Sequence, residues 1–504
     1  MDINLKKDEN RIREDFFALS SNRDIAALLE VPVSTLIYYV YRLQKEKQYK
    51  EFHIPKRNGK VRTINAPASN LKILQQKLNK TLQLVYVARN CSFAYTKNSS
   101  SIKNARAHVR SKVLVKIDLM DFFDQIHFGR IRGVFMAPFP FNFNKSVAST
   151  LSNICVYNSR LPQGAPTSPI ISNMICWAID RDLQRFCKKL HCVYTRYADD
   201  ITISTTESWE LPEDIAVFKN GSYEPGEKLK YYLDKHKFVI NQEKFRVLKP
   251  NNRQLVTGLV TNEFANVKRA YVHHIRHQLS IWEKEGLKGL ADYTKRSTNK
   301  DIDPRWSLLG KLNYLRQVRG SENTIYKKLR RWYDYLALKE RYLDMEKMID
   351  AQKRGLLFEA WFKDLLRLNK VDAHGHFTRR IGNDKIDGWV FLAGQHFITE
   401  CKWADTDGIN QEIKAFRSDI EDSGKGTRGI FVSVNGWNKE ATPIIENSSN
   451  KDMFLINGDD LKVIVANRDL PVEKLLLWKL GHFSVSVQAY RSAEEFWGEY
   501  KKTS

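Results

Sequence analysis

Two adjacent aspartates at a sharp turn constrain this chain more than any other feature of its sequence. Asp199 and Asp200 stand between two short apolar runs, at 193–197 and 201–204. Such runs predict two antiparallel strands that meet at the aspartates. Most Asp-Asp pairs belong to solvated turns, but flanking strands would hold this pair at a buried hairpin tip. Uncompensated charge is costly there, so the pair is expected to hold a cation.

Two other segments carry related features. An apolar run at 113–118 predicts a strand that ends on Asp118, and the aromatic Phe123 follows shortly after. A turn rich in proline and glycine at 161–169 then opens an apolar helix and contains Gln163 and Gly164.

Nucleotidyl transfer accounts for three carboxylates in such places. The reaction requires charge to be neutralised on the attacking oxygen, the leaving group and the phosphates. Two Mg²⁺ ions about 3.5–4 Å apart do this, and hard cations prefer carboxylate oxygens. Asp118, Asp199 and Asp200 are the candidate ligands and catalytic residues.

Together the segments resemble the palm motifs of reverse transcriptases in order and spacing. The resemblance implies that Asp118, Asp199 and Asp200 hold two Mg²⁺ ions. It also implies that Phe123 lies under the sugar of the incoming nucleotide and excludes a 2′-hydroxyl, so that the product is DNA. Gln163 and Gly164 would support the incoming nucleotide and the template.

An alternating stretch from 49 to 67, with Asn58-Gly59 at its centre, predicts a hairpin. In the resembled family this hairpin belongs to the fingers. Lys56 and Arg62 are then expected to bind the triphosphate, because Lys and Arg donors bind phosphate oxygens. Solvated surface cations are the alternative. Lys244 is expected near the leaving pyrophosphate.

Two shorter segments narrow the family. Asn104 and His108 precede the first palm motif, and Val256-Thr257-Gly258 follows the last. They resemble the NAxxH and VTG signatures of bacterial retron reverse transcriptases, although Asn104 and His108 at helical spacing also suit capping or packing. The resemblance covers roughly 15–345. It implies a structured noncoding RNA as template and primer, dNTPs as substrates, and branched multicopy single-stranded DNA (msDNA) as product. A group II intron-like or diversity-generating enzyme is the alternative.

The positive charge of the chain is unevenly distributed. The net charge is +24, but residues 351–504 contain 22 basic and 22 acidic side chains, so the excess lies in 1–350. A polyanionic partner for the first part is expected. The sequence predicts a helical region at 1–45, fingers and palm at 46–262, a helical basic thumb at 263–350, and a separate module at 351–504.

The C-terminal module carries a second set of charged residues. Asp387 precedes a predicted turn, Glu400 and Lys402 follow it, and Glu359 lies on an upstream helix. Residues i and i+2 of a strand face the same side, so Glu400 and Lys402 share one face. Asp387 and Glu400 can share a divalent cation while Lys402 positions or deprotonates water.

This set resembles the PD-(D/E)xK restriction-endonuclease-like fold, in particular its Mrr-type branch, with Ile386 in place of the proline. The resemblance implies a nuclease acting on DNA with one or two Mg²⁺ ions, or Mn²⁺, and Glu359 as a further metal ligand. A non-catalytic module that binds nucleic acid or a partner is the alternative.

The expected fold class is a multidomain α+β protein, a right-hand polymerase followed by an α/β restriction-endonuclease-like domain. The six cysteines lack metal-site spacing and are expected to be free thiols. The charged start of the sequence and the absence of a long apolar run predict a protein of the bacterial cytoplasm without a membrane partner. By resemblance, such a fusion acts in anti-phage defence. The oligomeric state is left open.

Overall fold

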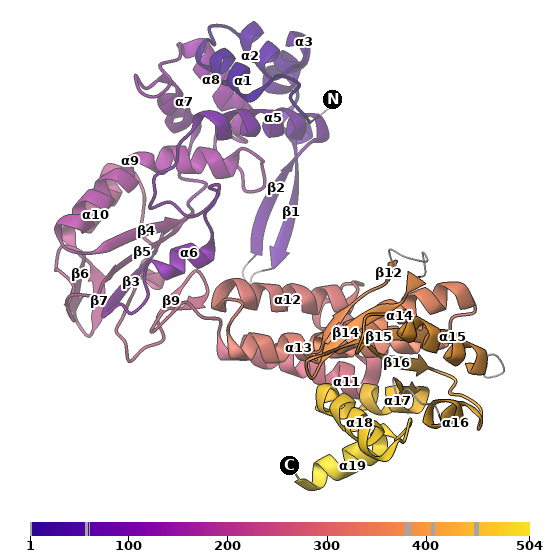
Figure 1. The fold of residues 1–504 in the computed structure, drawn as a ribbon. Helices are drawn as coiled ribbons and strands as arrows, with labels where there is room; N and C mark the ends of the chain where they lie inside the picture. The colour runs from indigo at the N-terminus through magenta and orange to yellow at the C-terminus, as the bar shows by residue number, and fades with distance from the viewer. Residues whose placement is uncertain are drawn as a thin grey trace. The chain divides into compact units, whose positions relative to one another are not determined.

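The computed structural model describes residues 3–55, 59, 61–378, 385–404, 409–447 and 453–503 (Figure 1). Two compact units divide the chain between Lys268 and Arg269. Each unit mixes helices and strands, as the sequence predicts. The finer division into four parts, with boundaries at 45/46, 262/263 and 350/351, stays a prediction.

The first unit opens with short helices, which confirm the helical prediction for 1–45. Ser21 begins the second of them, because its side chain accepts the amide of Asp24 while the Asp24 carboxylate accepts the amide of Ser21. The helices are α1 (Glu9–Phe17), α2 (Asn22–Leu28), α3 (Val33–Ile37), η1 (Tyr38–Arg42) and α4 (Lys45–Gln48).

The predicted hairpin at 49–67 is confirmed. Strands β1 (Tyr49–Pro55) and β2 (Val61–Pro67) pair antiparallel, with Pro55 opposite Val61. Lys56 and Asn58, expected near its tip, lie outside the described residues.

A four-stranded antiparallel sheet forms the centre of the first unit, in the order β4-β5-β3-β8. Strands β3, β4 and β5 confirm the strands predicted around the aspartates. The bounds are β3 (Val113–Asp118), β4 (Val193–Tyr197), β5 (Asp200–Thr205) and β8 (Arg246–Leu248).

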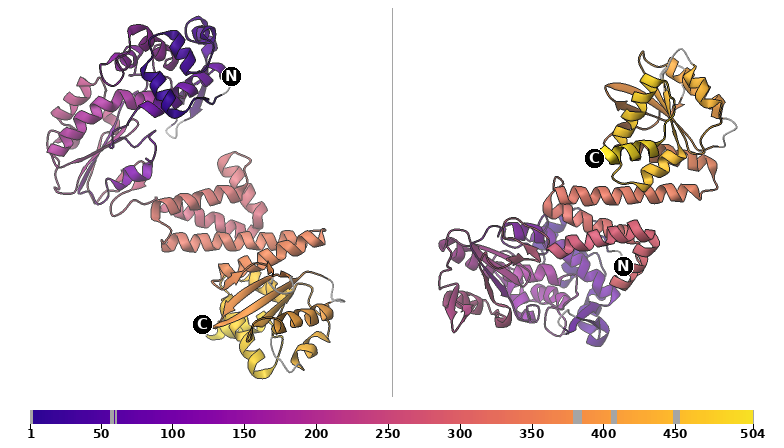
Figure 2. Two further views of the ribbon diagram at one scale, coloured as in Figure 1. Left: turned by 45° about the horizontal axis from the view of Figure 1, so that its top comes forward. Right: turned by 90° about the horizontal axis from the view of Figure 1, so that it is seen from below.

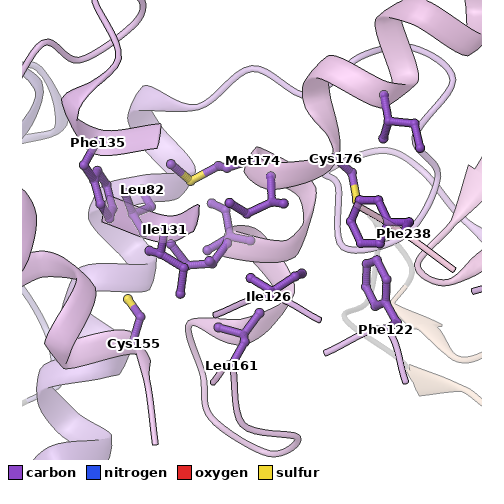
Figure 3. Packing of buried hydrophobic residues seen from close by; sticks show 14 of the residues in the cluster. Leu82, Phe122, Ile126, Ile131, Phe135, Cys155, Leu161, Met174, Cys176 and Phe238 are labelled. Atoms are coloured by element: carbon purple, nitrogen blue, oxygen red, sulfur yellow. The ribbon is translucent and has the colours of Figure 1, made fainter. Parts of the chain in front are cut away.

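Helices pack against this sheet and build a common apolar core. Figure 3 shows part of it, including Leu82, Ile131 and Met174, which come from three different helices. Phe122 stacks on Phe238 at a centroid distance of 5.7 Å. The helices are α5 (Ser69–Val85), α6 (Ser101–Arg106), α7 (Phe128–Met136), α8 (Lys145–Cys155), α9 (Ser168–Lys189), α10 (Glu227–Lys235) and η2 (Gln242–Lys244).

The prolines and glycines of residues 207–227 predict a loop-like insertion, but the region contains a hairpin instead. Strands β6 (Ala216–Lys219) and β7 (Ser222–Pro225) pair antiparallel. Asn220 and Gly221 form the tip with φ of 50° and 82°. Both residue types adopt positive φ readily, so the Asn-Gly pair closes the turn although the prolines nearby suggest a loop. A shorter antiparallel pair, β9 (Leu255–Val256) and β10 (Leu259–Val260), follows as the last two strands of the first unit.

The second unit begins with the predicted helical region, which is confirmed. Its helices are α11 (Arg269–Thr298), α12 (Pro304–Arg319) and α13 (Thr324–Glu346). The backbone of α11 breaks at Gly286, where φ is 71°. In both views of Figure 2 the long helix α13 runs along the C-terminal part of this unit. Its residues Leu338, Tyr342 and Met345 belong to the same apolar core as that part.

The C-terminal part is a five-stranded mixed sheet, in the order β11-β14-β15-β16-β17. The hairpin β14–β15 is antiparallel, whereas β15, β16 and β17 are parallel. The strands are β11 (Asp372–His374), β14 (Gly388–Leu392), β15 (Gln395–Lys402), β16 (Arg428–Ser433) and β17 (Met453–Asn457), with β12 (Phe377–Thr378) and β13 (Lys385–Ile386) as a separate pair.

Six helices of the described C-terminal part alternate with these strands or follow them, and buried residues of the helices and the strands share one apolar core. They are α14 (Ala351–Leu368), α15 (Ile409–Glu421), α16 (Ala441–Glu446), α17 (Gly458–Ala466), α18 (Val472–Ser486) and α19 (Ala493–Thr503). The apolar residues at 453–466 predict a single strand, and this prediction is wrong beyond 457. There Asn457 and Asp460 form a reciprocal capping box and start α17.

All six cysteines are buried and free, as expected. Among the described residues no single helix has the length and apolar character of a membrane span, although Asn22–Leu28 and Val33–Arg42, bent by 108°, meet that test as a pair.

His108 connects two neighbouring strands of the central sheet through hydrogen bonds to both. Its Nδ1 and Nε2 each lie 2.7 Å from a hydroxyl, that of Ser204 on β5 and that of Thr195 on β4. Burial lowers the pKa of this imidazole from 6.5 to about 3. The ring is therefore neutral in the folded protein and acts as a structural bridge, the packing role that the sequence left open for it.

We predict that this histidine makes the first unit acid-sensitive. Between pH 6.5 and 3 the unfolded chain binds a proton that the folded chain does not, so stability falls as pH falls, by up to about 1.4 kcal/mol per pH unit. His108→Gln keeps a donor and an acceptor without titrating. Urea unfolding from pH 7 to pH 4 should show a flatter dependence for His108→Gln, whereas His53→Gln, an exposed histidine on β1, should match the wild type. Equal slopes for all three would contradict this role.

Candidate active site

Three aspartates from two distant segments meet at one end of the central sheet. Asp118 at the end of β3 lies directly opposite Asp200 at the start of β5, and Asp199 precedes it at the turn. All three line one cavity of about 670 Å³. The convergence expected from the sequence is therefore present.

The turn that carries the aspartates is held from beneath by Arg196. Its guanidinium donates to both carboxylate oxygens of Asp180 on α9, at 2.8 and 2.7 Å, and to the Ala198 carbonyl at 3.0 Å. The side chains of Arg196 and Asp180 are 0% and 1% exposed. Ala198 itself has φ of 58°, in the left-handed region. The ion pair thus fixes a turn conformation that alanine seldom adopts.

Burial and mutual repulsion both act on the carboxylates. Burial raises the pKa of Asp199, and the charges of Asp118 and Asp200 raise it further. Burial also raises the pKa of Asp200, although Lys116 opposes this shift. The raised pKa values mean that the charged forms of Asp199 and Asp200 are disfavoured, first by burial and then by the neighbouring carboxylates, and a bound cation would offset both effects. The cavity is therefore suited to bind added positive charge.

Two lysines are the present counterions of the aspartates. Lys244 Nζ lies 2.9 and 3.0 Å from the two oxygens of Asp118, and Lys116 Nζ lies 3.1 Å from Asp200. Lys244, expected near the pyrophosphate, is thus beside the aspartates. Lys116 was not anticipated, but it stands two residues before Asp118 on β3 and so shares its face. Arg246, opposite Lys116 on β8, lines the same cavity and was also missed.

The donor set fits Mg²⁺ in its chemistry. In the described part of the chain, no group of three or more His, Cys, Asp or Glu side chains is already arranged around a metal position. The acidic donors of the cavity are carboxylate oxygens, which hard divalent cations prefer, and they carry uncompensated charge. Asp118 and Asp199 would hold the ions, with Asp200 beside them. Binding requires Lys244 to release Asp118.

The loop that precedes α9 rests against the hairpin β1–β2. The amide of Asn65 donates to the Gln163 carbonyl at 2.8 Å. Gly164 has φ of 127°, and a Cβ there would lie 2.8 Å from the Asn65 carbonyl oxygen. Only glycine fits both requirements, which explains its presence at this position.

The remaining predicted nucleotide-binding residues lie at different levels of burial. Phe123 is half-buried and packs edge-on against Phe122 at 5.2 Å. Arg62 is exposed on β2. Burial is the largest cause that raises the pKa of Tyr95; the charge of Asp199 raises it further, and the charge of Arg62 lowers it. Tyr95 therefore lies near both groups, and nothing in its sequence context marks it. The placement of Lys56 is outside the described residues.

The two short family segments pack together next to the cavity. Asn104 is buried on α6, and the hydroxyl of Thr257 donates to the carbonyl of Ser101, the first residue of that helix, at 2.8 Å. Ser101 and Thr257 both line the aspartate cavity. Gly258, with φ of 86°, completes the turn between Val256 and β10.

The second unit brings its own predicted residues together. On β15, Lys402 Nζ lies 2.8 Å from Glu400, and Asp387 accepts the amide of Cys401 at 2.8 Å. Lys402 also contacts Glu412 on α15 at 3.1 Å. Glu412 was not anticipated, because helix periodicity alone does not reveal which exposed glutamate faces the sheet edge.

Burial and like charge perturb this second cluster strongly. Burial raises the pKa of Glu400 to about 7, with Asp387 adding to the shift. Burial and Asp387 also raise the pKa of Glu359 to about 7. Burial alone would lower the pKa of Lys402, but Glu400 and Glu412 outweigh it and raise the pKa. Glu359, Asp387, Glu400 and Lys402 thus form one electrostatic group with excess negative charge.

Comparison with known proteins agrees with the first site. Residues 54–251 match the family model described as reverse transcriptase (RNA-dependent DNA polymerase). The chain is 32% identical to the retron Ec73 reverse transcriptase of Escherichia coli, over 54% of this chain and 89% of that protein. It is 30% identical to the retron Mx65 reverse transcriptase of Myxococcus xanthus, over 55% of this chain and 68% of that protein.

Among solved structures, telomerase from Candida albicans matches with 11% identity and covers 64% of each chain. Its TM-score of 0.31 is too low to bear on the fold.

We predict that the buried pair of Arg196 and Asp180 has two separable effects, one on the stability of the first unit and one on the conformation of the turn. Asp180→Asn leaves the Arg196 guanidinium buried without a counter-charge, which should destabilise the first unit by about 3–5 kcal/mol. The double variant Asp180→Leu with Arg196→Met removes both charges and should regain most of that loss. It also removes the donor to Ala198, so amide hydrogen exchange at 198–200 should stay faster than in the wild type. Full protection of those amides in the double variant would contradict the proposed support of the turn.

Proposed function

The chain belongs to the retron reverse transcriptases, and from this premise we propose that it copies a cognate structured noncoding RNA into branched msDNA. One observation carries the proposal: Asp118 and the Asp199–Asp200 turn converge on one cavity that holds excess negative charge. Its partners are then the RNA, dNTPs and the msDNA product.

The residues of the cavity have separate roles in this reaction. Asp118 and Asp199 would hold the two Mg²⁺ ions, which would supply charge neutralisation at the attacking oxygen and the leaving group. Lys116 holds Asp200 in its position opposite Asp118. Once Lys244 leaves Asp118, its ammonium is free to bind phosphate oxygens. Phe123 excludes a 2′-hydroxyl, while Gln163 and Gly164 support the incoming nucleotide.

We predict that Asp199→Asn blocks DNA synthesis and spares RNA binding. The amide keeps the shape of the side chain but loses the charge that holds metal, and a loss of several kcal/mol corresponds to at least about 100-fold in rate. Purified from its native host, the wild type should carry a branched RNA–DNA molecule, and Asp199→Asn should carry the RNA alone. Both species are identified by sequencing of the co-purifying nucleic acid.

Asp214→Asn is the matched control, since Asp214 pairs with Lys228 away from the cavity. It should carry the branched product. Product in the Asp199→Asn preparation would overturn the metal assignment. An unbranched DNA with the wild type would favour a group II intron-like or diversity-generating reaction instead.

For the C-terminal part of the second unit, residues 351–504, we propose a metal-dependent deoxyribonuclease of the PD-(D/E)xK type. The mixed sheet offers Asp387 beside β14 and Glu400 with Lys402 on β15, and Glu359 lies within electrostatic range on α14. Asp387, Glu400 and Glu359 would hold one or two Mg²⁺ or Mn²⁺ ions, which supply Lewis-acid activation of a phosphate. Lys402 orients the attacking water. Its contact with Glu412 restrains the ammonium in place.

We predict that this activity rises with pH. Glu400 and Glu359, with pKa values raised to about 7, are largely protonated below that pH, and protons compete with the cation for the same oxygens. Plasmid cleavage by the full chain in Mg²⁺ should therefore increase between pH 6 and pH 8. Glu400→Gln and Lys402→Met should abolish cleavage, whereas Glu421→Gln, in an exposed pair with Arg417, should not.

Absence of cleavage by the wild type, both alone and with its RNA–DNA product, would contradict the nuclease and favour a non-catalytic binding module. The wider proposal is anti-phage defence in a bacterial cytoplasm, with the second unit as effector. Its support is the bacterial origin of the similar retron enzymes and the joining of two units in one chain.

A further inference from the structure

A second cavity lies in the first unit, distinct from the aspartate cavity. It has a volume of about 690 Å³ and lies between the end of α5, the segment after α7, and α9. Val87 and Phe139 in its wall are 81% and 78% exposed. The walls are mainly apolar and include Tyr86, Pro140, Met174 and Trp177. The cavity shares no residue with the aspartate cavity.

Two arginines lie against the tryptophan of this cavity. The guanidinium of Arg89 is 5.2 Å from the ring centroid of Trp177, and that of Arg181 is 5.8 Å away. Arg89 also lines the cavity and is oriented by Gln184, whose side-chain oxygen it reaches at 2.8 Å. The half-buried indole thus stands between an apolar hollow and two positive charges.

Further cations continue from Trp177 along one side of α9. Arg181, Arg185 and Lys188 follow at intervals of four, four and three residues, which places them on the same side of the helix. Arg185 and Lys188 are exposed. Of the two acidic residues within this stretch, Asp180 is buried against Arg196, and Asp182 contacts Arg181, Lys235 and His236. The side is therefore strongly positive.

We propose that this cavity and the side of α9 formed by Trp177, Arg181, Arg185 and Lys188 bind a single-stranded segment of RNA. One unpaired base enters the apolar hollow and stacks on Trp177, and the following phosphates contact the cations. The combination of an aromatic platform with an adjoining row of cations matches a nucleic-acid strand, because every base has a stacking face and every linkage a negative charge. An apolar peptide would fit the apolar cavity, but it would not provide negative charge for the cations of α9. The choice of RNA rests on the proposed function, in which a structured noncoding RNA is both template and primer.

Equilibrium binding tests the aromatic contact. A fluorescein-labelled, unstructured 20-nucleotide RNA is titrated with the full chain in EDTA, so that metal-dependent binding at the aspartates does not contribute. Trp177→Leu should raise Kd about tenfold, the effect of losing one stacked base. Trp177→Phe should bind nearly as the wild type does, which separates loss of stacking from a failure to fold.

The chain offers a matched control for that measurement. Trp209 is 58% exposed and lies under Lys112 at 5.5 Å, yet it does not line this cavity. Trp209→Leu should leave Kd unchanged. An equal Kd for Trp177→Leu and the wild type would overturn the proposal. A loss of affinity for a DNA oligonucleotide of the same sequence with RNA affinity unchanged would overturn the assignment to RNA.

Salt dependence tests the cations independently. Each phosphate contact on a single strand contributes about 0.7 to the slope of log Kd against log salt concentration. Arg185→Gln with Lys188→Gln should therefore lower that slope by about 1.4, and an unchanged slope would overturn the proposed path. Crosslinking with 4-thiouridine RNA should label peptides from 85–90 or 174–178. Labelling confined to other peptides would also overturn it.

Discussion

The buried pair of Arg196 and Asp180 is the interaction on which the aspartate site depends. A turn with a left-handed alanine and two adjacent carboxylates is unfavourable both in backbone geometry and in charge. The guanidinium offsets the first cost through the Ala198 carbonyl, and it gains enough hydrogen bonds to offset its own burial. Tyr194 and Asn173 complete the same network, so that each charged group in it is satisfied. The conformation of the turn that carries the aspartates is therefore fixed by the protein's own side chains.

Both charged clusters of the protein share one electrostatic arrangement. Each places carboxylates at the ends of apolar strands, where burial raises their pKa values, and each uses lysines as temporary counterions. A lysine in this position has two consequences. It limits repulsion between the carboxylates, and in the proposed reactions its ammonium would become available to substrate phosphates once divalent ions were bound. Lys244 ends the short helix η2 beside the first sheet, and Lys402 lies on β15 of the second sheet.

Local sequence patterns predicted strands β3, β4 and β5, the hairpin β1–β2 and the meeting of the three aspartates, because alternation and turn chemistry act over a few residues. They did not predict Lys116 as the partner of Asp200, which requires the register of β3 against β5. The support of the turn by Asp180 also escaped prediction, since it depends on how α9 packs beneath β4. Two wrong predictions, at 207–227 and at 458–466, could have been avoided from the local sequence. The Asn220-Gly221 turn was obscured by nearby prolines, and the capping pair Asn457 and Asp460 was overlooked within an apolar stretch.

Helix α9 contacts both the turn that carries the aspartates and the surface for which we propose RNA binding. Its start follows the Gln163–Gly164 loop, and one side carries Asn173 and Asp180, which hold Arg196. The adjacent side carries Trp177 and the cations beyond it. Because 3.6 residues complete a turn, a single rigid helix can support the catalytic turn and present an RNA-binding side at the same time. Substitutions on the second side can therefore change RNA affinity while the buried network, and with it the geometry of the aspartates, stays intact.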